Sequence, residues 1–231
     1  MGRKLGDYVG GKMRKIAVIG LSSFGISALK TLSEQNIEII AIDTDEKKID
    51  DIKDFVTLPL VMDATKKDNL KSVEIDKTDV VIVSTGPELE PSILIVNILK
   101  ELGVKRIIAK ALSEEHARIL SLVGATEISY PERDAGKKIA KMLNFSNLLD
   151  YLPFDSGFMI QEIASPDIFY GKSLAELDIR NKFNITIIAI RSIIPEKMIP
   201  NPGADFIIKD SDILIIFGSE GDIEKFHKKI K

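Results

Sequence analysis

Residues 15–25 read KIAVIGLSSFG, so that a run of apolar, β-branched residues meets a glycine turn and then an amphipathic segment. Dinucleotide-binding folds carry the pattern G-x-G-x-x-G at such a junction, between their first strand and first helix. Gly20 and Gly25 occupy the first and third glycine positions, whereas Ser22 stands at the second. The stretch therefore predicts a strand, a tight turn and the start of a helix whose N-terminus can face a phosphate.

The same alternation of apolar runs and amphipathic segments continues to residue 144. Apolar runs such as VVIV at 80–83 are typical of strands that helices cover on both faces. Strands that alternate with helices predict right-handed crossovers and a doubly wound parallel sheet. The predicted strands are 16–19, 38–42, 56–61, 80–84, 106–110 and 127–130, and the predicted helices begin near Phe24, Asp45, Glu90, Ser113 and Pro131, with a short turn near Lys67.

The pattern changes after Asn144, where prolines and glycines separate short strands. The predicted strands here are 158–164, 185–191, 206–209 and 213–217, with short helices near Ser173 and at the C-terminus. We expect a Rossmann-like α/β domain followed by a small α+β domain. The predicted boundaries are a flexible leader over 1–14, a nucleotide-binding domain over 15–144, a linker or crossover over 145–156 and a C-terminal domain over 157–231.

Composition excludes several classes of function. The chain has 32 basic and 35 acidic residues, a net charge of −3, and this balance does not favour nucleic acid as a partner. It has no cysteine, which excludes disulfides and thiolate chemistry. Its two histidines, His116 and His227, lie among charged residues, and we expect both on the surface without a catalytic role. Apolar stretches are too short to span a membrane, which predicts a soluble protein, and the absence of cysteine favours a reducing cytoplasm.

Acidic and small polar residues follow the second, third and fourth predicted strands. Asp43 comes 23 residues after Gly20, where a carboxylate accepts the ribose hydroxyls of a dinucleotide and disfavours a 2′-phosphate. The alternative is that Asp43 caps the helix that begins near Asp45. The stretch 63–65 is either the adenine side of the site or a helix cap, and 85–86 is either part of the same edge or an ordinary turn.

Taken together, the motifs KIAVIGLSSFG, AIDTDEKKID, MDATKKDNL and ISYPERDAGKKIA resemble those of the regulatory subunits of Ktr/Trk potassium-uptake systems. These proteins consist of the two halves of the RCK module (regulator of conductance of K+), and GKSLAELDIRNKFNITIIAI resembles the C-terminal half. The resemblance implies a cytoplasmic, non-enzymatic nucleotide sensor. It also implies dimers that assemble into an octameric ring at the inner face of the membrane, beneath a membrane-embedded K+ channel or transporter subunit.

Carried over to this sequence, the resemblance implies an adenine-nucleotide site for ATP, ADP or NAD(H). Its residues would be Gly20, Leu21, Ser22, Ser23, Phe24, Gly25, Asp43, Thr44, Asp63, Ala64, Thr65, Thr85, Gly86, Lys110 and Glu132. Glu132 would reach the phosphates of a neighbouring subunit or a bound Mg²⁺ or Ca²⁺. Ser23 stands where ATP-sensing members commonly have arginine, which argues against strong discrimination of ATP from ADP.

The resemblance also implies a possible cyclic di-AMP site around Ile179, Arg180 and Pro195 in the C-terminal half. The alternative is that Asp178 and Arg180 organise the turn into the next strand. A different class of function is a NAD-dependent oxidoreductase or a NAD(H)-binding redox regulator. The short C-terminal half offers no convincing acid–base group for a dehydrogenase, which favours the regulator.

Overall fold

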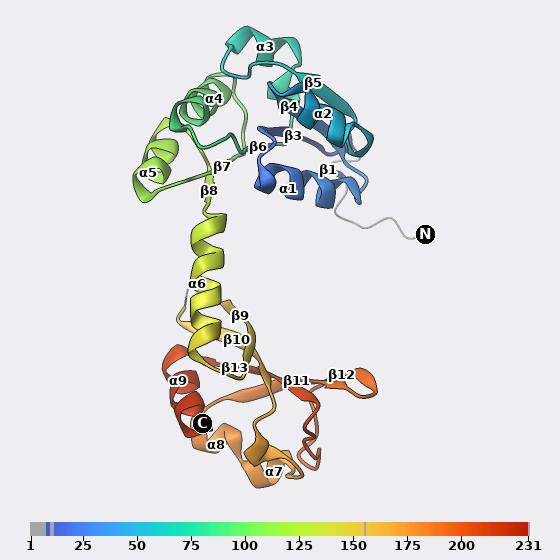
Figure 1. The fold of residues 1–231 in the computed structure, drawn as a ribbon, viewed down its shortest axis with the longest axis vertical. Coiled ribbons are helices and arrows are strands. Elements are labelled where there is room, and N and C mark those ends of the chain that lie inside the picture. The colour runs from blue at the N-terminus through green and yellow to red at the C-terminus, as the bar shows by residue number, and fades with distance from the viewer. Residues whose placement is uncertain (1–7, 10–11, 155, 231) are drawn as a thin grey trace. The chain divides into compact units, whose positions relative to one another are not determined.

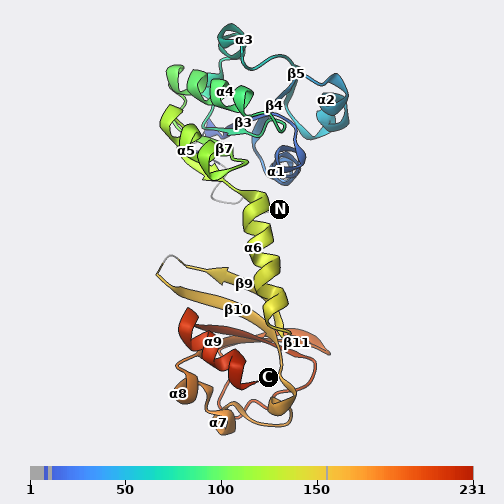
Figure 2. The ribbon, with the colours of Figure 1, turned by 60° about the vertical axis from the view of Figure 1, so that its left-hand side comes forward.

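The computed structural model describes residues 8–9, 12–154 and 156–230 (Figures 1 and 2). By their contacts, the residues divide into two compact units, Met1–Glu132 and Arg133–Lys231. Of the predicted leader, residues 1–7 and 10–11 lie outside the described residues. The strands β1 (Tyr8–Val9) and β2 (Lys12–Met13) form an antiparallel pair.

The first unit is built on a six-stranded parallel sheet with the strand order β5-β4-β3-β6-β7-β8. Its strands are β3 (Lys15–Ile19), β4 (Glu38–Asp43), β5 (Leu58–Val61), β6 (Val80–Val83), β7 (Ile107–Lys110) and β8 (Glu127–Ser129). Its helices are α1 (Ser23–Ser33), α2 (Glu46–Ile52), α3 (Lys67–Ser72), α4 (Leu89–Glu101) and α5 (Glu114–Val123). The predicted doubly wound sheet is confirmed, and its strand order reverses between β3 and β6, where such sheets bind ligands.

Successive residues of the central strands face two separate cores. Ala17 and Ile19 of β3 belong to the core that also contains residues of α4, such as Ile95. Ile16 and Val18 belong to the core that contains Leu29 of α1 and Ile49 of α2. Because helices cover both faces, alternation of polar and apolar residues is absent from these strands (Figure 1).

The second unit contains a five-stranded antiparallel sheet with the order β12-β11-β13-β10-β9. Its strands are β9 (Leu148–Pro153), β10 (Phe158–Ala164), β11 (Thr186–Ile193), β12 (Glu196–Pro200) and β13 (Asp212–Ser219). The helices are α7 (Leu174–Leu177), α8 (Ile179–Phe183) and α9 (Glu220–Lys229), together with α6 (Pro131–Asn144), which begins in the first unit. Among the described residues, no helix is both long and apolar enough to cross a membrane.

Three predictions for the second unit were wrong. Residues 148–153, predicted as linker, form β9, and 196–200, which had no predicted strand, form β12. Both strands lie at an edge of the sheet and end in a proline, which an edge tolerates because the missing N–H is not needed there. Conversely, the predicted strand 206–209 is reduced to an isolated bridge between Ser173 and Ile207.

Both histidines are buried, contrary to the expectation of surface positions. His227 is 3 % exposed, stacks on Phe145 with ring centroids 4.3 Å apart and contacts Gln161 Oε1 at 2.7 Å. His116 is 1 % exposed and lies between α4 and α5. Charged neighbours in the sequence point away on other faces of the helix, which is why the composition of the segment was misleading.

His116 should make the stability of the first unit dependent on pH. Its Nδ1 accepts the Leu112 N–H at 3.2 Å, which leaves Nε2 to donate to Ser92 Oγ at 2.9 Å, and burial lowers the pKa of the imidazole. The folded state therefore favours neutral His116, so its contribution is complete above about pH 6.5, the unfolded pKa, and is lost as the pH falls toward the lower folded pKa.

We expect the free energy of unfolding, measured with urea, to stay level above about pH 6.5 and to fall below it by up to about 1.4 kcal/mol per pH unit. His116→Gln retains polar atoms but does not titrate in this range, and it should flatten the profile. An equally steep profile in the variant would assign the pH dependence to other groups.

Candidate functional site

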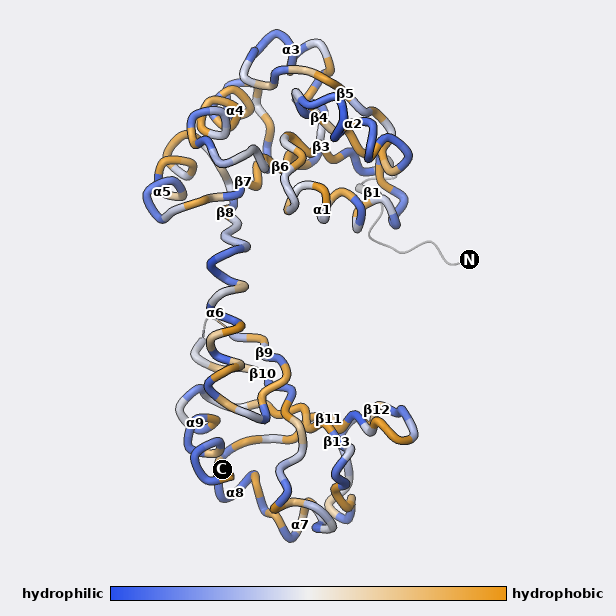
Figure 3. The backbone as a smooth tube through the Cα atoms, viewed as in Figure 1, coloured by the Kyte–Doolittle hydropathy of each residue, from blue (hydrophilic) through white to orange (hydrophobic). Residues whose placement is uncertain are grey.

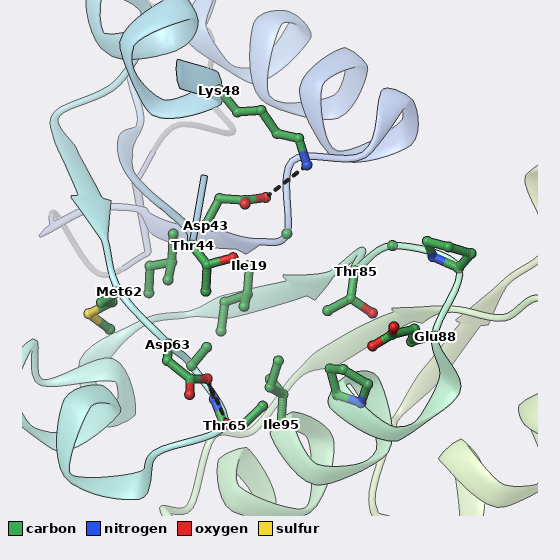
Figure 4. A pocket seen from close by; sticks show the side chains of 16 residues that line it. Ile19, Asp43, Thr44, Lys48, Met62, Asp63, Thr65, Thr85, Glu88 and Ile95 are labelled. Atoms are coloured by element: carbon green, nitrogen blue, oxygen red, sulfur yellow. Dashed lines mark hydrogen bonds and ion pairs between the residues drawn. The ribbon is translucent and has the colours of Figure 1, made fainter. Parts of the chain in front are cut away.

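A pocket of about 520 Å³ lies where β3, β4, β5 and β6 end, at the carboxyl edge of the parallel sheet (Figure 4). This size suits a small-molecule ligand. Of the predicted site residues, the structure brings eight together here: Gly20, Asp43, Thr44, Asp63, Ala64, Thr65, Thr85 and Gly86. The remaining lining residues are Ile19, Ile42, Lys48, Met62, Pro87, Glu88, Pro91 and Ile95.

Two glycines allow the turn after β3 to pack tightly. Gly20 has a φ of +88°, and a Cβ there would lie 2.4 Å from the carbonyl oxygen of Ser84. A Cβ on Gly25 would lie 2.4 Å from the carbonyl oxygen of Gly20, so α1 could not begin so close to the strand. Both positions therefore require glycine, for the steric reasons that the sequence pattern predicts.

Asp43 joins the end of β4 to the glycine turn. Its Oδ2 accepts the Leu21 N–H at 2.6 Å, and its Oδ1 accepts the Asp45 N–H at 2.9 Å. Lys48 Nζ lies 3.7 Å from Oδ2, and the Asp43 side chain is only 10 % exposed. The cap of α2 is Asp45, which accepts from Lys47 N–H and Lys48 N–H, so the alternative role of Asp43 as a helix cap is wrong.

Asp63 is held within its own turn at the end of β5. Its Oδ1 accepts both the backbone N–H of Thr65, at 2.9 Å, and the Thr65 hydroxyl, at 2.6 Å. These hydrogen bonds lower the pKa of Asp63, so the carboxylate stays ionised beside the pocket. The cap position of α3 is Lys66, which makes no side-chain capping bond, and Asp63 is therefore not a helix cap.

The predicted residues from Leu21 to Gly25 form the turn and the start of α1 without lining the pocket. Ser22 caps α1 by accepting the Gly25 N–H at 3.5 Å, and its hydroxyl also makes a short hydrogen bond to the Ser84 hydroxyl. The expected phosphate position is thus bordered by a side chain where a glycine would leave open space.

Lys110 and Glu132 pair with each other and are not among the residues that line the pocket. Their Nζ and Oε1 atoms are 2.5 Å apart, and this hydrogen bond lowers the pKa of Glu132. Lys110 is 11 % exposed and Glu132 is 66 % exposed at the start of α6. Within the described part of the chain, no group of three or more His, Asp and Glu side chains is placed to hold a metal ion.

Sequence reasoning missed several lining residues. Lys48 lies in the first turn of α2, five positions after Asp43. Because α2 begins close to the end of β4, its first turn lies beside the edge of the sheet that forms the pocket. The segment after the predicted Thr85–Gly86 edge contributes Pro87, Glu88 and Pro91 to the lining. Extending the predicted edge by five residues would have found them. Ile95 is a buried apolar residue in the interior of α4, so no polar signal marked it as a lining residue.

The residues of the predicted second site have different environments. Ile179 is 4 % exposed and belongs to the core of the second unit, whereas Arg180 is exposed on α8. Pro195 is exposed in the turn between β11 and β12 and follows a cis peptide bond. Ile179 is therefore a packing residue, and only Arg180 and Pro195 are accessible to a ligand.

The matches to protein families cover both units. The model of the TrkA-N domain matches residues 16–131, and the model of the TrkA-C domain matches residues 159–231. The chain is 39 % identical to the Ktr system potassium uptake protein C of Bacillus subtilis over 94 % of this chain and 97 % of that protein. It is 33 % identical to the Ktr system potassium uptake protein A of the same organism, with the same coverage.

Solved structures share the fold at lower identity. The GsuK RCK domain aligns with a TM-score of 0.52 and 22 % identity over 95 % of this chain and 48 % of that one. The GsuK channel bound to NAD aligns with a TM-score of 0.52 and 21 % identity over 94 % of this chain and 38 % of that one. With matches of this extent in both halves, the chain belongs to the family of TrkA-N and TrkA-C domain proteins that includes the Ktr system potassium uptake proteins.

Proposed function

We propose that this chain is the regulatory subunit of a Ktr-type potassium-uptake system and binds an adenine nucleotide in the pocket at the carboxyl edge of its parallel sheet. Two relatives that match this chain across almost their whole length are Ktr system potassium uptake proteins. The chain acts as a regulator and not as an enzyme. Its partner is a membrane-embedded K+ channel or transporter subunit, which it meets on the cytoplasmic face of the membrane.

The observation that carries the nucleotide assignment is the position of Asp43. Its carboxylate ends β4 and lies in the pocket lining together with Gly20, one strand away from the point between β3 and β6 where the strand order reverses. A carboxylate at this place accepts ribose hydroxyls in nucleotide-binding Rossmann folds. Thr44 and the 63–65 turn supply the neighbouring wall for the base. The residues therefore fit the adenosine part of ATP, ADP or NAD(H).

The experiment that tests the assignment is thermal unfolding of the purified chain with ATP, ADP, AMP, NAD, NADH and cyclic di-AMP. A ligand that binds only the folded state raises the unfolding temperature by mass action. At a hundred times its Kd, such a ligand stabilises by about 2.7 kcal/mol. We expect adenine nucleotides to raise the unfolding temperature and a pyrimidine nucleotide, as the control, to leave it unchanged.

We further propose that copies of the chain assemble through α6, first as dimers and then as an octameric ring. Ile139 and Leu143 of this helix are 58 % and 82 % exposed, whereas Met142 packs against the core of the second unit. Figure 3 shows that α6 is mostly hydrophilic in its first half and mixes hydrophobic with hydrophilic residues in its second. An exposed apolar stripe of this kind favours association.

Light scattering at micromolar concentration should give a mass at least twice the 25.6 kDa of the chain. Leu143→Asp changes an exposed side chain, so it should leave folding intact and weaken the association by about tenfold or more. A parent protein that remains at 25.6 kDa would contradict the assembly through α6.

Glu132 is proposed as the residue through which a divalent cation assists nucleotide binding, with the phosphates as further ligands. A carboxylate beside phosphates needs a cation between them, and Mg²⁺ prefers such oxygen ligands. A cation at Glu132 has to displace Lys110, its present partner.

We expect Glu132→Gln to retain nucleotide binding but to lose most of its dependence on Mg²⁺ in calorimetry. Glu127→Gln, which breaks the ion pair with Arg106, is the matched control and should leave that dependence unchanged. Equal Mg²⁺ dependence in Glu132→Gln and the parent would remove Glu132 from cation binding.

Cyclic di-AMP is proposed as a second ligand in the C-terminal unit, at Arg180 and Pro195. The guanidinium of Arg180 is exposed and suits phosphate recognition. Thermal unfolding of Arg180→Ala with cyclic di-AMP separates this site from the pocket of the first unit.

A further inference from the structure

The pocket of the first unit has a charge that disfavours phosphate. Its lining carries the carboxylates of Asp43, Asp63 and Glu88 and a single ammonium group, that of Lys48. Lys48 already lies 3.7 Å from Asp43, so it is partly neutralised. Phosphates among these side chains would meet more like charge than opposite charge. The lining therefore suits the uncharged, hydroxyl-rich adenosine part of a nucleotide, and the phosphates must lie beyond it.

Beyond the pocket lining lies the N-terminus of α1, where the Ser22 hydroxyl takes the place that a phosphate would need. The Ser22 hydroxyl accepts the Gly25 N–H at 3.5 Å, one of the donors that a phosphate would use. The same hydroxyl is bonded to that of Ser84, which is fully buried between β6 and the pocket residue Thr85. The Leu21 N–H, another donor of this turn, is bound to Asp43.

We infer that, without a divalent cation, this site recognises the adenosine part of its ligand and gains little from the phosphates, because the Ser22–Ser84 pair closes the phosphate position. A phosphate reaches the helix only if the Ser22 side chain turns away and gives up both of its hydrogen bonds. Each of these hydrogen bonds makes a modest net contribution to the free energy. Losing both therefore cancels about a tenfold gain in affinity from the new phosphate contacts. Adenosine and AMP should then bind nearly as tightly as ADP and NAD. This inference rests on the proposed nucleotide site and defines which ligands that site distinguishes.

The test is calorimetry on the full chain, in buffer free of divalent cations, with adenosine, AMP, ADP and NAD, for the parent protein, Ser22→Gly and Ser84→Ala. Glycine is tolerated at a helix cap with little loss of stability, so Ser22→Gly should remain folded. Ser84→Ala removes the hydrogen-bond partner of Ser22 but keeps the Ser22 hydroxyl. It therefore tests independently whether the Ser22–Ser84 pair closes the phosphate position. Ser33→Ala, at the far end of α1, is the matched control, because its hydroxyl donates to the Lys30 carbonyl oxygen, away from the pocket.

For the parent, we expect the four affinities to lie within about tenfold of one another. Ser22→Gly should tighten ADP and NAD binding about tenfold and leave adenosine unchanged, and Ser84→Ala should act in the same direction by a smaller factor. The control should match the parent for all four ligands.

Two results would overturn the inference while the nucleotide site stands. One is a parent that binds ADP more than about a hundredfold tighter than adenosine. The other is a Ser22→Gly variant with an unchanged or lower ratio of ADP to adenosine affinity. If none of the four ligands binds the parent, or if Asp43→Ala binds them as the parent does, the proposed function fails and the inference fails with it.

Discussion

Gly20→Ala should destabilise the first unit by roughly 2–5 kcal/mol, the sum of the strain of an L-residue at positive φ and of overpacking. The φ at this position is +88°, and the added Cβ would lie 2.4 Å from Ser84 O and 2.7 Å from Thr85 N. Both contacts are to backbone atoms at the end of β6, a central strand of the sheet. Such atoms cannot move aside as the end of a flexible side chain would. The free energy of unfolding in urea measures the effect.

The matched control is Gly136→Ala, in the interior of α6. Beyond the backbone of the helix itself, no atom lies within 4 Å of a Cβ at that position, and alanine is the better helix former, so stability should rise by about 0.5–1 kcal/mol. If both variants unfold at the same urea concentration as the parent, the close approach of the glycine turn to β6 is not a determinant of the fold.

Asp43→Ala should weaken adenine-nucleotide binding by roughly 1.5–3 kcal/mol, which is about a tenfold to hundredfold loss of affinity. The carboxylate that would accept ribose hydroxyls is removed, and the Leu21 N–H loses its acceptor. Asp43→Asn keeps an oxygen for Leu21 N–H but loses the charge, so comparing the two variants by calorimetry separates the ribose contact from the support of the turn.

Asp45→Ala is the control for this comparison. Asp45 lies two residues away and caps α2 without lining the pocket, so its loss should reduce stability by about 1 kcal/mol and leave affinity unchanged. Unaltered affinity in folded Asp43→Ala would remove Asp43 from the ribose.

The sequence predicted the first unit more completely than the second because its central strands are buried on both faces. Continuous apolar runs such as 80–83 are a strong signal for a strand, and Ser113 and the glycine turn mark the helix starts. The edge strands β9 and β12 of the second unit give no comparable signal, since one side of each is unpaired and each ends in proline. The burial of His116 depends on its contact with Ser92 of another helix, 24 residues away, which no local pattern reveals.

For the pocket, the sequence predicted correctly those lining residues whose polar side chains lie at or just after the end of a strand. Asp43 is the last residue of β4 and Asp63 is the second residue after β5, so their meeting at one sheet edge follows from the parallel topology. Lys48 and Glu88 enter from the flanking segments, whose direction depends on packing. Lys110 has the expected place at the end of β7 but directs its ammonium group to Glu132, a pairing that strand order alone does not indicate.

The most direct test of the account is K+ flux in vesicles that contain a Ktr-type membrane subunit together with this chain. A ligand regulates only if it binds two conformations with different affinity, so nucleotide at the pocket must change the flux. We predict that addition of ADP or ATP alters the K+ flux with the parent chain and that Asp43→Ala requires at least about tenfold more nucleotide for the same change. A flux that no adenine nucleotide alters, or that responds identically in Asp43→Ala and the parent, would contradict the account.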